Sequence, residues 1–96
     1  MVRIVIVPGN GCFPVRDSNW YEYAERKLLQ SDIFDEVILT DMPDPVEARE
    51  SIWLPFLLNS CKVDDQTIVI GHSSGAGIRC TYYAEPLTLR IYGILL

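Results

Sequence analysis

Length, composition and charge limit the protein to a few classes. The chain has 96 residues, enough for one domain with one modest core, and its 49% hydrophobic and 22% charged content is typical of a globular protein. Eight basic against thirteen acidic residues give a net charge of −5 without a basic stripe, so we expect no nucleic-acid partner.

Cysteine usage and hydropathy add further exclusions. Cys12, Cys61 and Cys80 are odd in number and form no C-x-x-C pair, and one histidine cannot complete a zinc site, so we expect reduced thiols and neither metal nor organic cofactor. The N-terminal MVRIVIVPGN breaks too early for a signal peptide, and no apolar run approaches the roughly 20 residues of a membrane span. We therefore expect a soluble, cytoplasmic protein with no membrane partner.

The first predicted elements are a strand and a helix. RIVIV is an unbroken β-branched run that ends at Pro8, which predicts a strand buried on both faces. After a loop, NWYEYAERKLLQ predicts a helix whose apolar residues recur every four positions (Trp20, Ala24, Leu28). The polar residues before it can cap its start: Asp17, Ser18 or Asn19.

A second strand and helix follow. Glu36–Thr40 predicts a short strand. In the next segment, Asp44 is expected to cap a helix that has Pro45 at its first position and Glu47 completing a capping box. We expect Pro55 to kink or end this helix, because proline lacks the N–H that continues it.

The remaining pattern predicts a strand over 66–71, a helix over 74–85 and a strongly apolar strand over 89–96. Strict alternation of strands and helices predicts a three-layer α/β/α domain over residues 1–96, with a parallel sheet of strand order 2-1-3-4. So apolar a parallel strand is usually covered on both faces and paired with a further strand. We therefore expect the sheet to be truncated after the fourth strand.

The turn after the third strand carries a chemical motif. Residues 71–75, GHSSG, fit the G-x-S-x-G pattern of a nucleophilic serine held on a strained turn between strand and helix. The pattern predicts Ser73 as nucleophile, with the backbone N–H of Ser74 as one oxyanion donor and a second donor from the loop over residues 9–12. A Gly/Ser-rich turn with no chemical role is the alternative. Neither a Gly-Lys-Ser/Thr phosphate loop nor a complete G-x-G-x-x-G fingerprint occurs.

No acid–base partner for this serine is evident. His72 is the single histidine, and because adjacent strand residues point to opposite sides, we expect it to be packed and hydrogen-bonded beneath the turn, not to act as a base. Asp44 is better explained as a helix cap, and Asp41 has no histidine to orient.

Aromatic residues have two expected places. Trp53, Leu54 and Phe56 are expected to pack the second helix onto the sheet as part of the core, with the lining of a substrate pocket as the alternative. Trp20 and Tyr21, just past the first loop, are expected to border the mouth of the site.

Four segments together resemble a known family. IVPGNG, MPDP, ARESIWLPF and TIVIGHSSGA are similar to the N-terminal half of the retinoblastoma-binding protein 9 family of serine hydrolases, which has the α/β-hydrolase fold and includes bacterial relatives of YdeN type. The resemblance runs from Ile4 to Leu96, with gaps. It implies that Ser73 forms an acyl-enzyme, with oxyanion donors from Ser74 and the Asn10/Gly11 loop. It also implies cleavage of ester or amide bonds of small molecules or short peptides, with an aminopeptidase-like preference.

The chain departs from that family in two respects. The family's triad Asp and His follow the nucleophile, yet no Asp or His occurs between Ser74 and Leu96, and Glu85 lies roughly 15 Å from the turn along the predicted helix. We therefore expect both partners outside this chain, which by itself is expected to be inactive; an inactive product acting as a protein-interaction module is the alternative. The L-x-C-x-E motif for retinoblastoma-type pocket proteins lacks its leucine and glutamate around Cys61, so that partner is not expected.

Overall fold

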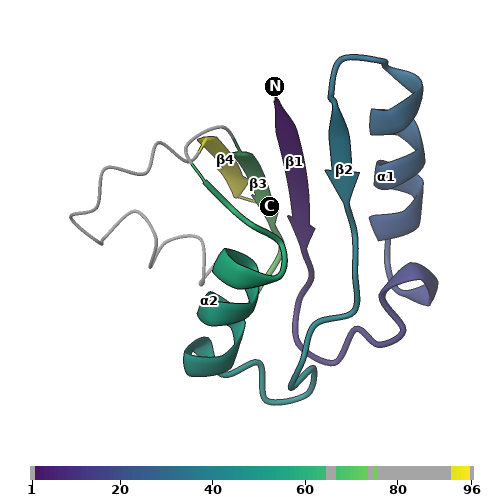
Figure 1. Ribbon diagram of the computed structural model, residues 1–96. Coiled ribbons are helices and arrows are strands. Elements are labelled where there is room, and N and C mark those ends of the chain that lie inside the picture. The colour runs from purple at the N-terminus through teal and green to yellow at the C-terminus, as the bar shows by residue number, and fades with distance from the viewer. Residues whose placement is uncertain (1, 65–66, 74, 76–91, 96) are drawn as a thin grey trace.

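The protein forms a small sheet with helices on both faces (Figure 1). The computed structural model describes residues 2–64, 67–73, 75 and 92–95. Its elements, in chain order, are β1 (Arg3–Val7), the short 3-10 helix η1 (Val15–Asp17), α1 (Tyr21–Gln30), β2 (Glu36–Ile38), α2 (Glu50–Asn59), β3 (Thr67–Gly71) and β4 (Tyr92–Leu95). Within these described ranges, no helix is long and apolar enough to cross a membrane.

The sheet has four parallel strands in the order β2-β1-β3-β4, which confirms the predicted topology. The register pairs Val5 with Val69 and Val7 with Gly71, so β1 and β3 end side by side. Of the predicted fourth strand, residues 92–95 are strand. The predicted helix over 74–85 lies outside the described residues except for Gly75.

The central strand β1 is buried along its whole length because it has a helix on each side. Val5 and Val7 pack in one cluster with Trp53 and Leu57 of α2. Ile6 packs in a second cluster around α1. Successive strand residues point to opposite faces, so α1 and α2 cover opposite faces of the sheet and the predicted α/β/α layering is confirmed.

The start of α1 differs from the expectation. The helix begins at Tyr21 and no side chain caps its N-terminus. Asp17 is part of η1, and the Ser18 hydroxyl donates to the Pro14 carbonyl oxygen (2.9 Å). Asn19 is left-handed, with φ of 46°. The predicted caps are therefore wrong, because local turns use these residues before the helix begins.

The start of α2 is also corrected. The helix begins at Glu50, not at Pro45, because Asp44 and Ala48 are left-handed, with φ of 48° and 51°. The Asp44 carboxylate instead accepts the Arg49 N–H (3.0 Å) and pairs with the Arg49 guanidinium (2.9 Å). These bonds from Arg49 lower the pKa of Asp44. Asp44 thus closes a turn ahead of the helix and is not its N-cap.

Of the two outcomes expected for Pro55, an end of α2 is wrong, since the helix continues to Asn59, and a kink stays a prediction. Pro55 and Ser51 are both exposed, so water can satisfy the Ser51 carbonyl that a proline leaves without a donor. Trp53 is fully buried, and its indole N–H donates to the Pro43 carbonyl oxygen (2.7 Å). The predicted core role of this helix is confirmed, with two further partly buried side chains packed on the cluster: Leu54 and Phe56.

Candidate active site

Ser73 stands at the carboxyl-terminal edge of the sheet, immediately beyond β3. It is exposed and left-handed, with φ of 56°, a conformation that strains a residue with a side chain. The His72 N–H donates to the Val7 carbonyl oxygen (3.1 Å), which continues the pairing of β3 with β1 up to the serine. The Gly75 N–H donates to the His72 carbonyl oxygen (3.0 Å) and closes the turn. This is the strained turn that the motif predicts.

Two glycines let the chain pass close to this turn. A Cβ on Gly75 would lie 2.2 Å from the Val7 carbonyl oxygen, so only glycine fits there. A Cβ on Gly9 would lie 3.1 Å from the Ser73 Cβ and 3.6 Å from its Oγ. The loop that follows β1 therefore lies directly against the serine, where an oxyanion loop is expected.

The predicted oxyanion donors are partly placed. Asn10 is exposed and directly follows Gly9, the glycine that packs against Ser73. The Gly11 N–H donates to the Pro45 carbonyl oxygen (2.6 Å), which directs it toward the 43–49 segment. Ser74 lies outside the described residues. The oxyanion assignment stays a prediction, and Asn10 is the loop residue that we retain for it.

His72 is packed and hydrogen-bonded beside the turn, as expected. Its Nδ1 lies 2.7 Å from the Tyr21 hydroxyl oxygen. Its ring makes edge contacts with the rings of Trp20 and Tyr21, with centroids 5.4 and 5.7 Å apart. The interaction with Tyr21 occupies Nδ1, so this nitrogen is not free to accept a proton from Ser73.

The sequence predicted that Tyr21 borders the mouth of the site. This prediction is wrong, because Tyr21 is fully buried. Its hydroxyl accepts the Gly9 N–H (3.0 Å) and lies 3.5 Å from the Cys12 Sγ. Burial, followed by the contact with Cys12, raises the pKa of Tyr21 to about 12. The contact of Gly9 with Ser73, and the bonds of Tyr21 to Gly9 and His72, were not predicted from the sequence. Only the position of Gly9 at the end of an apolar strand hinted at its role.

The two aspartates near this edge are used structurally. The Asp41 Oδ1 accepts the Val15 N–H (2.7 Å), which ties the segment after β2 to η1. Asp44 is paired with Arg49. Among residues that the structure describes, no three His, Cys, Asp or Glu side chains gather closely enough to hold a metal ion.

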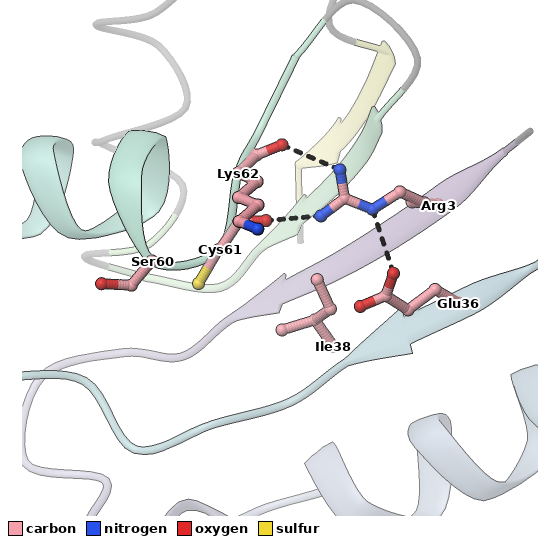
Figure 2. A pocket seen from close by; sticks show the side chains of 6 residues that line it. All are labelled: Arg3, Glu36, Ile38, Ser60, Cys61 and Lys62. Atoms are coloured by element: carbon pink, nitrogen blue, oxygen red, sulfur yellow. Dashed lines mark hydrogen bonds and ion pairs between the residues drawn. The ribbon is translucent and has the colours of Figure 1, made fainter.

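A hollow of about 400 Å³ lies at the other end of the sheet (Figure 2). Its lining includes Arg3 and Glu36, the first residues of β1 and β2, so roughly 13 Å of strand separates it from the Ser73 edge. The Arg3 guanidinium donates to the carbonyl oxygens of Lys62 (2.8 Å) and Cys61 (2.5 Å), and its Nε lies 3.3 Å from the Glu36 carboxylate. These bonds hold the segment after α2 against β1, so we read this end as structural.

A parallel sheet between two helix layers, with a strained serine turn at its carboxyl-terminal edge, defines an α/β-hydrolase-type fold. No family model matches the chain. The chain is 46% identical over 94 residues to the Serine hydrolase RBBP9 of Rattus norvegicus, covering 98% of the chain and 48% of that protein. This similarity confirms the resemblance to the retinoblastoma-binding protein 9 family.

A solved structure agrees with this fold. The ydeN gene product from B. subtilis matches with a TM-score of 0.72 at 20% identity, over 99% of this chain and 50% of the other. The chain therefore spans about half the length of each of these two relatives.

Proposed function

We propose that Ser73 is the nucleophile of a serine hydrolase that cleaves ester or amide bonds. The observation that carries the proposal is the strained, exposed Ser73 at the sheet edge, with the Gly9 loop packed against it. Left-handed residues also occur in other turns of this chain, but backbone strain is concentrated at active sites, where it can hold a reactive group in place. The 46% identity to a protein named a serine hydrolase supports the same chemistry.

In this mechanism the Ser73 Oγ attacks the substrate carbonyl and forms an acyl-enzyme, which water then hydrolyses. The backbone N–H groups of Asn10 and Ser74 stabilise the negative charge on the carbonyl oxygen during attack. Small molecules and short peptides are the proposed substrates, and the cytoplasm the proposed location.

Among the described residues, no side chain is positioned as the base of this reaction. The single histidine of the sequence is His72, whose Nδ1 is engaged by Tyr21. A serine hydroxyl without a base is a weak nucleophile. We therefore expect residues 1–96 alone to turn over substrate very weakly or not at all.

A fluorophosphonate probe tests the proposal in two polypeptides: the chain itself, and the chain joined to the second half of the rat relative. We expect weak labelling of the first and strong labelling of the second, lost in Ser73→Ala and localised to Ser73 by peptide mapping. Absence of labelling in a folded joined protein would refute the proposal and favour a non-catalytic interaction module. Strong labelling of the chain alone would refute the requirement for an outside base.

A further inference from the structure

One hydroxyl group connects the two segments that meet at the serine. Tyr21, the first residue of α1, is fully buried, and its hydroxyl oxygen lies 3.0 Å from the Gly9 nitrogen and 2.7 Å from the His72 Nδ1. Gly9 packs against Ser73, and His72 is the residue directly before Ser73 in the chain. The phenol is therefore bonded to the loop beside the nucleophile and also to the turn that carries it.

The donors and acceptors around this hydroxyl can be matched in one consistent arrangement. A phenol has one proton to donate and can accept two bonds, whereas an amide N–H only donates. Gly9 takes one acceptor position, and we assign the phenol proton to the short contact with the His72 Nδ1. The Cys12 thiol can donate to the second acceptor position or to the Asn10 carbonyl oxygen (4.0 Å), while the Asn19 amide donates to the Cys12 Sγ (3.4 Å).

This pattern assigns a tautomer to His72. A ring nitrogen that accepts the phenol proton carries no proton of its own, so neutral His72 is protonated on Nε2. The high pKa of Tyr21 agrees with a phenol that keeps its proton across the pH range of an enzyme assay.

We propose that Tyr21 is a positioning residue for Ser73: its hydroxyl holds the Gly9 loop and the His72 turn at a fixed separation. This inference rests on the proposed function of Ser73. The separation matters because the serine belongs to the turn and an oxyanion donor belongs to the loop. A misplacement of about 1 Å between reacting groups can lower a rate a hundredfold. A buried hydrogen bond is well suited to fix such a distance.

Kinetics of the joined protein described above test the positioning. We expect Tyr21→Phe to lower kcat at least tenfold and to leave KM within twofold, since the phenol does not touch substrate. The matched control is Tyr23→Phe, on the same helix but 56% exposed, which should leave both constants within twofold. A kcat of Tyr21→Phe within twofold of the parent overturns the proposal. Active-site titration normalises each rate to folded enzyme.

A second pair of variants applies if Tyr21→Phe does not fold. His72→Gln keeps a side-chain acceptor for the phenol proton, whereas His72→Leu has none. We expect the Gln variant to retain a kcat at least fivefold above that of the Leu variant. Equal losses in the two variants overturn the proposal.

Nitrogen NMR of the chain itself tests the bond without any activity. Because the sequence has one histidine, the imidazole signals need no assignment. We expect Nε2 protonated and Nδ1 unprotonated in the parent and in Tyr23→Phe, with this preference lost in Tyr21→Phe. A proton on Nδ1 in the parent overturns the assigned direction of the bond, and a tautomer preference unchanged in Tyr21→Phe overturns the bond itself. If the joined protein shows no hydrolase activity, the proposed function fails and the positioning role with it, whereas the NMR result reports on the bond alone.

Discussion

Gly75 lies so close to the end of β1 that a methyl group on its Cα would stand 2.2 Å from the Val7 carbonyl oxygen. The same methyl group would stand 2.8 Å from the Pro8 carbonyl oxygen. Both contacts are with backbone, which cannot rotate aside as a side chain can. The last glycine of the G-x-S-x-G motif is thus a packing requirement between the serine turn and the central strand.

Gly75→Ala should therefore be much more destabilising than Gly11→Ala. Overpacking against backbone is expected to lower the free energy of unfolding by about 3 kcal/mol. Gly11 has a φ of 79° but no other atoms within 4 Å of an added Cβ, so alanine there carries only the strain of a left-handed residue, about 1 kcal/mol. Urea unfolding of the two variants checks this order. Equal losses would contradict the close approach at Gly75.

The sheet could be predicted from the sequence because each strand is marked by a short, continuous apolar run. The apolar runs that became β1 and β3 show burial on both faces, and alternation with helices restricts the strand order. The starts of α1 and α2 could not be predicted in the same way. Asp44 sits in a strong capping pattern, yet its carboxylate bonds Arg49 after a left-handed turn, and neither feature has a sequence signature.

The candidate site likewise has one residue whose position the sequence predicts and one whose position it does not. The glycine spacing predicted the position of Ser73, since a strained turn imposes that spacing. The place of Tyr21 depends on a contact with His72, which is 51 positions away in the chain. A tyrosine at the start of an amphipathic helix is equally compatible with the surface, so only the fold reveals that it is buried.

Adjacent leucines on α2 give a second prediction. Leu57 is fully buried in the cluster beneath β1, whereas Leu58 is 42% exposed. Leu57→Ala should lower the free energy of unfolding by about 3 kcal/mol, through lost burial and the cavity left behind. Leu58→Ala should lower it by about 0.5 kcal/mol, as is usual for surface positions. Thermal or urea unfolding checks both, and a larger loss for Leu58→Ala would mean that α2 faces the sheet differently.

The structural role of Arg3 gives a third prediction. Its side chain is buried, and the guanidinium donates to two backbone carbonyl groups and forms an ion pair with Glu36 (Figure 2). Arg3→Met should lower the free energy of unfolding by about 2 kcal/mol, because it leaves the two carbonyl groups without their charged donor. The control is Arg26→Met, which removes an exposed pair with Glu22 and an exposed contact with the Tyr23 ring, and should change stability by about 0.5 kcal/mol. Urea unfolding distinguishes the two variants, and comparable small losses would show that the Arg3 bonds contribute little.

Cysteine reactivity gives a fourth prediction, with a defined dependence on pH. Cys61 is 3% exposed, and burial raises the pKa of its thiol, whereas Cys12 is half-buried in the loop after β1. A raised pKa means less thiolate at any given pH below it, and the thiolate is the form that reacts with iodoacetamide. In the folded chain near neutral pH, Cys61 should react at least about tenfold more slowly than Cys12.

Peptide mapping by mass spectrometry measures both rates, and denaturation in urea is the control, since it should make them equal. The raised pKa of Cys61 also determines how the free energy of unfolding changes with pH. A thiol whose folded pKa is raised contributes stability below its ordinary pKa of about 8.5, and this contribution is lost as the pH rises through the folded value. Cys61→Ala should remove that part of the alkaline loss of stability. Equal native rates for Cys61 and Cys12 would contradict the burial of Cys61 between α2 and β1.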